Sequence, residues 1–382
     1  MTLTRELFIM LRIFVRNTLI VVLLLTSVIA GSAEAAAETN PCDSLPRSST
    51  RWIGQLINNG FQIHDSTICY PAFPRFALNV YNWGDKTFNS YDTAYVVGTG
   101  KNWKLQGKAY NWIETQTMIF PKNSLISMHS NLFSDAGGYL SFMAVSVGYM
   151  WNMDRLFDHD TQRRTFNFDF SCSRFFINYS KVSSEGGMIL TRLGDYNDGK
   201  NIHYDFDDAK LISTNLDAYY FFNHYKYSHS AAYSFSKYQL RTAGTALAGF
   251  NYSEQDISIN FSELPPDMLA ELPLGISKYR FHYRDIALLG GYARNWALSP
   301  RKWLLNATLL GVVGYKRTYE DDTEGARNML ANGYRFSMSC VYNHGALFAS
   351  AQLRSYGSLF YNSAFTHFNT ISSLTLIVGM RF

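Results

Sequence analysis

Apolar and polar residues alternate one by one over most of the chain beyond about its first hundred residues. The stretch RTFNFDFSC (164–172) places three Phe side chains on one face and Asn167 and Asp169 on the other. WLLNATLLGVVGY (303–315) and YRFSMSCVY (334–342) repeat the same period. A period of two residues is that of a β-strand whose two faces differ in polarity. The pattern therefore predicts an all-β protein.

The alternation predicts about twelve strands, with ten or fourteen as the alternatives. They span residues 103–120, 123–133, 138–153, 164–181, 186–194, 211–223, 240–254, 278–292, 302–318, 333–343, 345–356 and 370–382. Soluble β-sandwiches also alternate. These strands, however, are long, carry aromatic residues near the ends of their apolar faces, and have small polar residues opposite. We therefore expect a transmembrane antiparallel up-and-down β-barrel over residues 103–382, and a soluble glycan-binding sandwich is the alternative.

Connection lengths agree with a barrel. Short connections are expected at 134–138, 298–302 and 343–345, and long ones near 154–163, 195–210, 254–277, 319–332 and 357–369. Outer-membrane barrels alternate short periplasmic turns with longer extracellular loops in this way. The segment 223–240 is long where a short turn is expected. We predict that it holds a strand extension and a helical piece.

The N-terminal part predicts export. Residues 1–35 contain three Arg, an apolar run over 19–30 and a small-residue cleavage site ending at Ala35, which is the layout of a signal peptide. A single membrane anchor is the alternative, but the run is shorter than a spanning helix needs. Residues 36–102 predict a short irregular N-terminal arm, with a possible helix in RWIGQLINNG (51–60), that packs in the lumen or at the periplasmic mouth.

Composition narrows the class of protein. Charged residues make up 17% of the chain, aromatic residues 16%, and the mean hydropathy is −0.13. A bundle of membrane helices would be far more apolar, whereas in a barrel only every second strand residue faces lipid. The net charge of +4 and the lack of a Lys/Arg cluster on a helix face argue against a nucleic-acid partner. We expect contact with outer-membrane lipid, and the extracellular partner stays open.

Four cysteines show no metal-binding spacing, and we predict no metal and no cofactor. Cys42 and Cys69 could form a disulfide or stay as two thiols. Cys172 and Cys340 fall on apolar strand faces and are expected to face lipid. The acidic loops 194–208 and 319–325 could offer oxygen ligands to Ca²⁺, but their spacing favours solvated surface loops.

Charged residues within the predicted strands suggest a polar lumen. The inward candidates are Asp169, Asp217, Arg280, His282, Arg284, Lys316, Arg335 and Arg354, with Arg381 at the rim. A ring of such charges could guide an anionic solute through a channel with a cationic lumen. Alternatively, they pair with one another and close a narrow barrel, which is the interpretation that we favour because small barrels are commonly filled by their own side chains.

For an enzyme, the best candidate is His229 between Ser228 and Ser230, by analogy with lipid hydrolases of the outer membrane. Neighbours in a strand point to opposite faces, so His229 and Ser230 could not pair within one strand. The chain has no G-x-S-x-G or H-E-x-x-H motif. We therefore predict no catalytic residue and a non-enzymatic protein.

The chain ends in LTLIVGMRF (374–382), with apolar residues at every second position. A barrel has no free edge, so the last strand should pair with the first. The ending resembles the terminal strand that the outer-membrane assembly machinery recognises. Val378, Met380 and Phe382 are its predicted signal residues.

Three parts of the sequence resemble a family of uncharacterised Gram-negative outer-membrane β-barrel proteins. They are SYDTAYVVGTGKNWKL (90–105), YYFFN (219–223) with AAYSFSKYQ (231–239), and GGYARNWALSP (290–300). The resemblance implies an outer-membrane barrel and brings no catalytic or binding residue. The expected role is structural, surface-interacting or that of a narrow channel. A solute channel and, further away, a lipid hydrolase are the alternatives.

Overall fold

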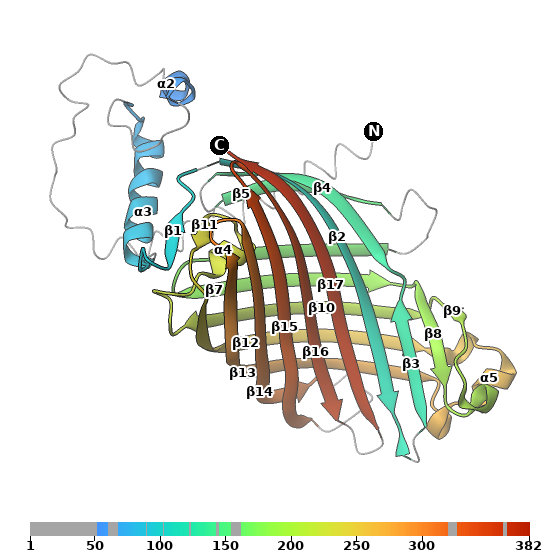
Figure 1. Cartoon of the computed structure of the whole chain (residues 1–382). Helices are drawn as coiled ribbons and strands as arrows, with labels where there is room; N and C mark the ends of the chain where they lie inside the picture. Colours follow the sequence, from blue (N-terminus) through green and yellow to red (C-terminus); the bar gives the residue numbers. More distant parts are fainter. Residues whose placement is uncertain are drawn as a thin grey trace. The chain divides into compact units, whose positions relative to one another are not determined.

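A computed structural model of the chain describes residues 52–59, 68–88, 90–101, 103–121, 124–142, 145–153, 162–319, 327–361 and 365–382. The chain divides into two compact units, residues 1–56 with 63–71 and residues 57–62 with 72–382. All predicted strands belong to the second unit (Figure 1). The predicted signal peptide lies outside the described residues.

Helices are few. They are α2 (Trp52–Asn58), α3 (Ala72–Phe88), α4 (His229–Tyr233), α5 (Pro266–Ala270) and the 3-10 turns η5 (Tyr196–Gly199), η6 (Phe261–Glu263) and η7 (Pro273–Gly275). The helix expected in 51–60 is α2. In the part of the chain that the structure describes, no helix is both long enough and apolar enough to cross a bilayer.

Strands dominate the second unit. They are β1 (Val96–Gly98), β2 (Trp103–Ile119), β3 (Leu125–Ser130), β4 (Phe133–Phe142), β5 (Val145–Asn152), β6 (Gln162–Ser171), β7 (Phe175–Glu185), β8 (Met188–Leu193), β9 (Tyr204–Phe206), β10 (Ala209–Phe221), β11 (Lys237–Gln239), β12 (Ala243–Asn260), β13 (Lys278–Ser299), β14 (Trp303–Thr318), β15 (Asn328–His344), β16 (Leu347–Tyr361) and β17 (Thr366–Arg381).

The long strands form one antiparallel sheet in chain order. It runs from β6 through β7, β10 and β12 to β17, and β17 then pairs with β2 along its whole length. The backbone of Phe382 exchanges hydrogen bonds with that of Trp103, at 3.0 and 3.1 Å. The prediction that the last strand pairs with the first is therefore confirmed. We call the end of the barrel that holds Trp103 and Phe382 the terminal end, and the opposite end the loop end.

The sheet closes at the loop end through a strand that changes partners. β7 pairs with β10, but its continuation β8 pairs with β3 and β9. Gly186 and Gly187, with φ of +74° and +66°, lie at this change, in a backbone region that favours glycine. Since β3 also pairs with β2, the ring of strands is complete there. The predicted antiparallel up-and-down barrel is confirmed.

Two strands are present only at the terminal end. β5 pairs with β4 and β6 pairs with β7, and among the described residues neither has a second strand partner. Around the terminal end the sheet thus holds β2, β4, β5, β6, β7, β10 and β12 to β17, which are the twelve described strands there. The predicted number of about twelve agrees with this half.

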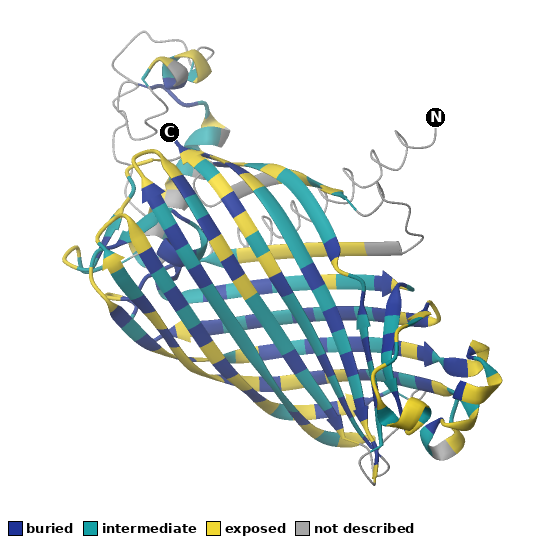
Figure 2. Ribbon diagram, turned by 45° about the vertical axis from the view of Figure 1, so that its right-hand side comes forward, coloured by how far each residue is buried: buried dark blue, intermediate teal, exposed yellow. Residues whose placement is uncertain are grey.

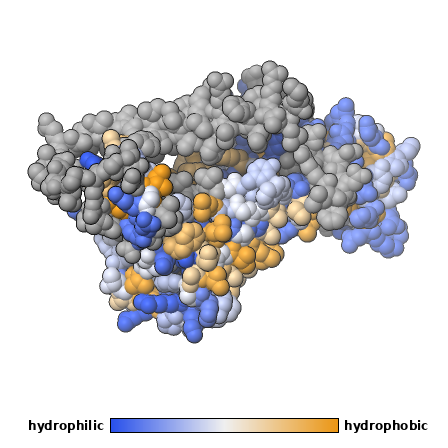
Figure 3. Space-filling view, turned by 90° about the horizontal axis from the view of Figure 1, so that it is seen from above, coloured by the Kyte–Doolittle hydropathy of each residue, from blue (hydrophilic) through white to orange (hydrophobic). Residues whose placement is uncertain are grey.

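Burial alternates along the strands, as Figure 2 shows in dark blue and yellow. On β14, Leu309 and Val313 are exposed while Leu310 and Val312 are buried. The buried set faces the lumen, because Phe281 of β13 contacts Phe360 of β16, three strands further along the sheet, at 5.1 Å between ring centroids. The exposed set forms an apolar outer wall. In Figure 3, apolar residues gather over the middle of the visible face.

An apolar core fills the lumen in the loop half. Its fully buried members include Ile126, Leu190, Ile257, Phe281 and Phe360. Residues from the connection between β12 and β13 cover it, among them Phe261, Leu264 and Met268. The prediction that small polar residues line the lumen is therefore wrong for this half of the barrel.

The sequence pattern missed one tight turn and predicted another where the chain forms a strand. The predicted strand 164–181 is broken at 172–174 into β6 and β7, and the predicted turn at 134–138 lies inside β4. Cys172, expected to face lipid, is buried in the first of these turns, where its backbone N–H donates to the Phe175 carbonyl at 3.0 Å. Alternation that continues across a short turn hides the turn.

Candidate functional site

The connection between β10 and β12 folds into the barrel at its terminal end. We call residues 222–242 the plug. It contains α4 and β11, and Tyr227, Ser228 and Ala232 within it are fully buried. β11 pairs with β1, from the predicted N-terminal arm. The segment without a clear role in the sequence is thus the element that fills this end.

Local chemistry explains the short helix of the plug. Ser228 is its N-cap, and the Ser228 hydroxyl oxygen accepts a hydrogen bond from the Ala231 N–H at 3.2 Å. Phe235, just beyond the helix, has a φ of +58°. This left-handed conformation is costly for an aromatic residue. It lies where the Phe235 ring packs on Phe348 of the barrel, at 4.7 Å between centroids.

Cationic side chains from the first and last strands hold the plug. Arg381 Nε donates to the Phe235 carbonyl oxygen at 2.7 Å, and Arg381 Nη2 donates to Asn343 Oδ1, also at 2.7 Å. Lys104 Nζ donates to the Ser234 carbonyl oxygen at 2.6 Å. Charge-assisted bonds of this kind are stronger than neutral ones. The predicted inward position of Arg381 is correct, and its partner is the plug backbone.

Neutral polar groups on three more strands complete the attachment. Asn295 Nδ2 donates to the Ser228 carbonyl oxygen at 2.9 Å, and Ser339 Oγ donates to the Ala232 carbonyl oxygen at 3.1 Å. The Tyr233 hydroxyl donates to Asn306 Oδ1 at 2.9 Å. The plug is therefore bonded to β2, β13, β14, β15 and β17.

His229 lies inside the barrel, within an aromatic cage. Its ring centroid is 4.6 Å from that of Phe176, 4.5 Å from Tyr233 and 5.3 Å from Phe221. Both ring nitrogens are buried and without a hydrogen-bond partner among the described residues. Burial lowers the pKa of His229 to about 3, with a smaller contribution from Arg354 in the same direction. The imidazole is therefore neutral at physiological pH.

Two ion pairs cross the lumen beside the plug. Arg335 Nε lies 3.2 Å from Asp217 Oδ2, and the second oxygen of Asp217 accepts from Asn251 Nδ2 at 2.6 Å. Arg354 Nη2 lies 3.4 Å from Asp169 Oδ2. Each pair joins strands that are not neighbours in the sheet, so both connect opposite walls.

A third ion pair marks the boundary with the apolar core. Lys316 Nζ lies 3.4 Å from Asp285 Oδ2, and the Lys316 side chain is 0% exposed. The same ammonium lies over the Tyr283 ring, 3.6 Å from its centroid. A cation this deeply buried must be paired.

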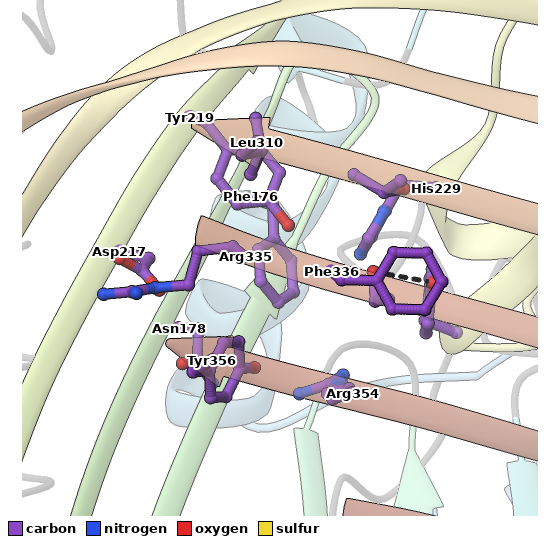
Figure 4. Close-up of a pocket in the computed structure, with 13 residues that line it drawn as sticks. Phe176, Asn178, Asp217, Tyr219, His229, Leu310, Arg335, Phe336, Arg354 and Tyr356 are labelled. Atoms are coloured by element: carbon purple, nitrogen blue, oxygen red, sulfur yellow. Dashed lines mark hydrogen bonds and ion pairs between the residues drawn. The ribbon is translucent and has the colours of Figure 1, made fainter. Parts of the chain in front are cut away.

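Between the plug and the ion pairs lies a cavity of about 30 Å³. Figure 4 shows the Arg335 side chain extending toward Asp217. His229 lies on the opposite side of the cavity. Tyr219, Arg354 and Tyr356 also line it. The volume is that of about one water molecule. This cavity is therefore too small to hold a solute larger than water.

Eight residues were predicted to line the lumen, and the structure divides them. Asp169, Asp217, Lys316, Arg335 and Arg354 lie inside, in the pairs above. The prediction is wrong for Arg280, His282 and Arg284. On β13 the buried inward residues are Tyr279, Phe281, Tyr283 and Asp285, so these three lie on the outer face.

The correction changes the electrostatics of the lumen. Asp285, which the sequence did not single out as an inward residue, faces in and pairs with Lys316. Lys316, Arg335 and Arg354 are thus matched by three carboxylates, so the expected cationic excess disappears from these ion pairs. Arg381 and Lys104 also point inward, where they bond to carbonyl oxygens of the plug. The alternation of faces along a strand could have shown that Asp285 points inward. Ile286 and Leu288 of the same strand are exposed, so its even-numbered residues face outward and its odd-numbered residues face inward.

The acidic loop 194–208 carries no cation site in the structure. Lys200 pairs with Asp198 at 3.3 Å, and Asp207 Oδ1 accepts from the Gly187 N–H at 2.9 Å. Among the described residues no group of three acidic, His or Cys side chains could hold a metal ion. Most of the second acidic loop lies outside the described residues.

The terminal strand has the predicted faces. Val378 and Met380 are on the outer face, 64% and 41% exposed, while Arg381 points in. The Phe382 ring stacks on Trp103, at 6.4 Å between centroids and 10° between planes.

Residues 90–382 match the family described as "Domain of unknown function (DUF4421)". The chain belongs to this family. The matched range covers the whole DUF4421 barrel together with β1. A comparison of the DUF4421 chain with curated proteins finds no match.

Solved structures similar to the DUF4421 chain are outer-membrane proteins. The outer membrane protease OmpT from Escherichia coli is 9% identical over 74% of this chain and 97% of that one, with a TM-score of 0.35. The P. putida toluene transporter TodX is 7% identical over 74% and 90%, with a TM-score of 0.27. At these values the likenesses carry no argument about activity.

Proposed function

We propose that the protein is an integral outer-membrane β-barrel with a closed lumen, which acts through its outer wall and extracellular loops rather than as an enzyme or an open pore. The terminal end, with its short turns, would face the periplasm, and the loop end would face the cell exterior.

The outer wall supports a membrane location. On β14, Trp303 and Tyr315 face outward at the two ends of an apolar stretch that includes Leu309 and Val313. Twelve residues separate the two aromatics, which is about 40 Å along a strand. A tilt of about 45° reduces this to about 28 Å across the membrane, close to the ~25 Å apolar band of outer-membrane barrels.

The main support for a closed lumen is that two separate parts of the protein occupy it. The plug blocks the terminal half, and the apolar core around Phe281 fills the loop half. An open channel would require both to move, and the apolar core offers no polar surface to water. The ion pairs between them hold opposite walls together rather than leaving charges free for a solute.

Planar-bilayer conductance of the purified full-length protein tests this proposal. We expect no step conductance from the wild type, nor from a variant in which residues 224–241 are replaced by a short Gly-Ser linker. Heat-modifiable gel mobility of both proteins would show that they are folded barrels. Steps from the wild type would overturn the closed lumen.

A gated solute channel is the second candidate. It is favoured by the attachment of the plug, which is tied to the wall at both ends and held by individual hydrogen bonds together with a small apolar contact around Phe235. Steps that appear only in the linker variant would establish this function in place of the first, because they would show that the plug alone closes the pore.

A hydrolase at His229 is not part of the proposal. The His229 ring is buried inside the barrel, and the Ser230 hydroxyl lies 3.2 Å from that of Ser171 rather than bonding to the imidazole. A lipid substrate on the outer wall could not reach either group. Lipid turnover should be the same in a His229→Ala strain, and a loss of turnover would restore the enzyme hypothesis.

We further propose that the assembly machinery recognises the terminal strand. Deleting Phe382 removes its stacking on Trp103 and the two backbone hydrogen bonds that join these residues at the junction of β17 and β2. We expect the membrane level of this deletion variant to fall several-fold. Leu374→Ala, which changes the same outer face away from the end, is the control. Equal levels of the deletion variant and wild type would contradict the proposal.

A further inference from the structure

The outward residues Arg280, His282 and Arg284 belong to a cluster on the outer face of the loop half. With Glu254 and Asp256 of β12, Arg317 of β14 and Tyr319 just beyond it, they form what we call the rim cluster. Arg284 lies directly opposite Arg317, and the next outward pair toward the middle of the barrel is Ile286 with Tyr315. The two arginines therefore begin where the apolar outer wall ends.

The carboxylates of the rim cluster are already engaged. Asp256 Oδ2 lies 3.2 Å from Arg280 Nη2. Glu254 accepts hydrogen bonds from the hydroxyls of Tyr252 at 3.1 Å and Tyr319 at 3.0 Å. Arg280 thus has its counter-charge on the neighbouring strand, while Glu254 is bonded to two tyrosines.

Arg284 and Arg317 are not paired in this way, although Glu254 of β12 lies directly opposite Arg284, because both oxygens of Glu254 accept hydrogen bonds from tyrosine hydroxyls. Within the described part of the chain, neither forms an ion pair with a carboxylate. Like charges directly opposite each other on adjacent strands destabilise a sheet. Tyr319 keeps Arg284 in place, since the guanidinium lies 5.9 Å from the centre of the Tyr319 ring, which itself stacks on His282. The pair is thus positioned, and no carboxylate of the described residues lies within ion-pair distance of either guanidinium group.

We propose that Arg284 and Arg317 bind the phosphate of an anionic lipid in the outer leaflet. Side chains directly opposite on antiparallel strands start about 5 Å apart, so two guanidinium groups can contact one phosphate group. The apolar residues just below, Ile286, Leu288 and Val313, are 52%, 73% and 57% exposed and form the surface for the acyl chains. Charge and apolar surface together fit a lipid rather than a free anion. The inference rests on the proposed membrane location.

Native mass spectrometry of the full-length protein with added diphosphoryl lipid A tests the site. We expect Arg284→Gln and Arg317→Gln each to lower retention of the lipid about tenfold, and the double variant to lower it further. Arg280→Gln is the matched control, because it removes the same charge from the same face of β13 but from an arginine already paired with Asp256. It should change retention less than twofold. The Arg284→Lys/Arg317→Lys variant keeps the charge without the planar fork and should fall between wild type and the glutamine double variant.

Several outcomes would overturn the proposal. Equal losses in Arg280→Gln and Arg284→Gln would show diffuse charge attraction without a site. Equal retention of lipid A and of free inorganic phosphate would show an anion site without lipid contact. Binding that appears only after Glu320, Asp321 and Asp322 are neutralised would show that the chain satisfies the arginines itself. Wild-type protein without heat-modifiable mobility in the membrane fraction would instead remove the proposed function, so the two failures are distinguishable.

Discussion

The loop half of the lumen is filled by a large apolar cluster that includes Phe281, Phe360 and Leu190, whereas the terminal half is filled by the plug, which combines a smaller apolar cluster with hydrogen bonds. Apolar packing is summed over many weak contacts and does not depend on any one of them. The plug has a smaller apolar contact around Phe235 and depends in addition on separate bonds from Arg381, Lys104 and Asn295, each of which one substitution removes. The same barrel thus contains one closure that resists change and one that can be released.

The largest expected effect is on the apolar half. Phe281→Ala would leave a cavity among fully buried rings and lower the free energy of unfolding by about 3–5 kcal/mol. Urea unfolding in detergent measures this. Leu288→Ala, on the outer face of the same strand and 73% exposed, should cost less than about 1 kcal/mol. Similar losses in the two variants would remove the distinction between inner and outer faces of β13.

The boundary pair gives the next effect. Lys316→Met leaves Asp285 buried without its counter-charge and should cost about 3 kcal/mol in the same assay. Adding Asp285→Leu to Lys316→Met should recover most of the loss, since two apolar residues can replace a buried pair. Arg354→Met breaks the pair with Asp169, in which the Arg354 and Asp169 side chains are 22% and 42% exposed. It should lower the free energy of unfolding by less than about 1 kcal/mol. An unrecovered double variant would mean that the pair does more than neutralise charge.

A smaller change is expected when the plug loses one bond. Arg381→Gln removes the donor to the Phe235 carbonyl, a loss of about 1–3 kcal/mol for a charged donor to a buried acceptor. Hydrogen exchange of the backbone over 228–235 should quicken about tenfold or more, while that of β14 stays unchanged. Arg294→Gln, on the exposed outer face of β13, is the control and should leave both rates as in the wild type.

The smallest effect concerns pH. His229 has a pKa of about 3 in the seated plug and an ordinary value of 6.5 in water, so release of the plug takes up a proton below pH 6.5. The seated plug is therefore fully stable above pH 6.5 and loses stability as the pH falls toward 3. At pH 5.5 the released fraction should rise about tenfold, measured by the same exchange after correction for intrinsic rates. His229→Phe should abolish this dependence, and an unchanged slope in that variant would assign it to another group.

The sequence predicts more of the outer wall than of the lumen. Lipid selects apolar residues at every second position, so Leu374, Leu376 and Val378 are recognisable as outward residues, and all three are exposed. Inward positions obey no such rule. Phe281 and Tyr283 are as apolar as any outer residue because they pack in a dry core, while Arg284 faces out. Polarity alone thus assigned the charged residues of β13 to the wrong face. The odd–even alternation along the strand would have assigned them correctly.

The plug could not be derived from periodicity, because its order comes from contacts distant in sequence. Tyr233 bonds to Asn306 and Ser337, and Lys104 bonds to Ser234. Local pattern in 223–240 predicts a helical piece, which is α4, but nothing in the stretch indicates that a barrel surrounds it. The turn at 172–174 was hidden for the opposite reason, since alternation runs through it without interruption.

The attachment of the plug to the first and last strands imposes an order of events during biogenesis. Residues 222–242 are synthesised well before Arg381, which belongs to β17. Until β17 arrives, the Phe235 carbonyl has no guanidinium donor and the wall has no closing strand beside β2. β17 therefore completes two events at once, since it closes the wall beside β2 and supplies the donor that holds the plug. A chain truncated before β17 would lack both, which couples the presence of this strand to the integrity of the barrier.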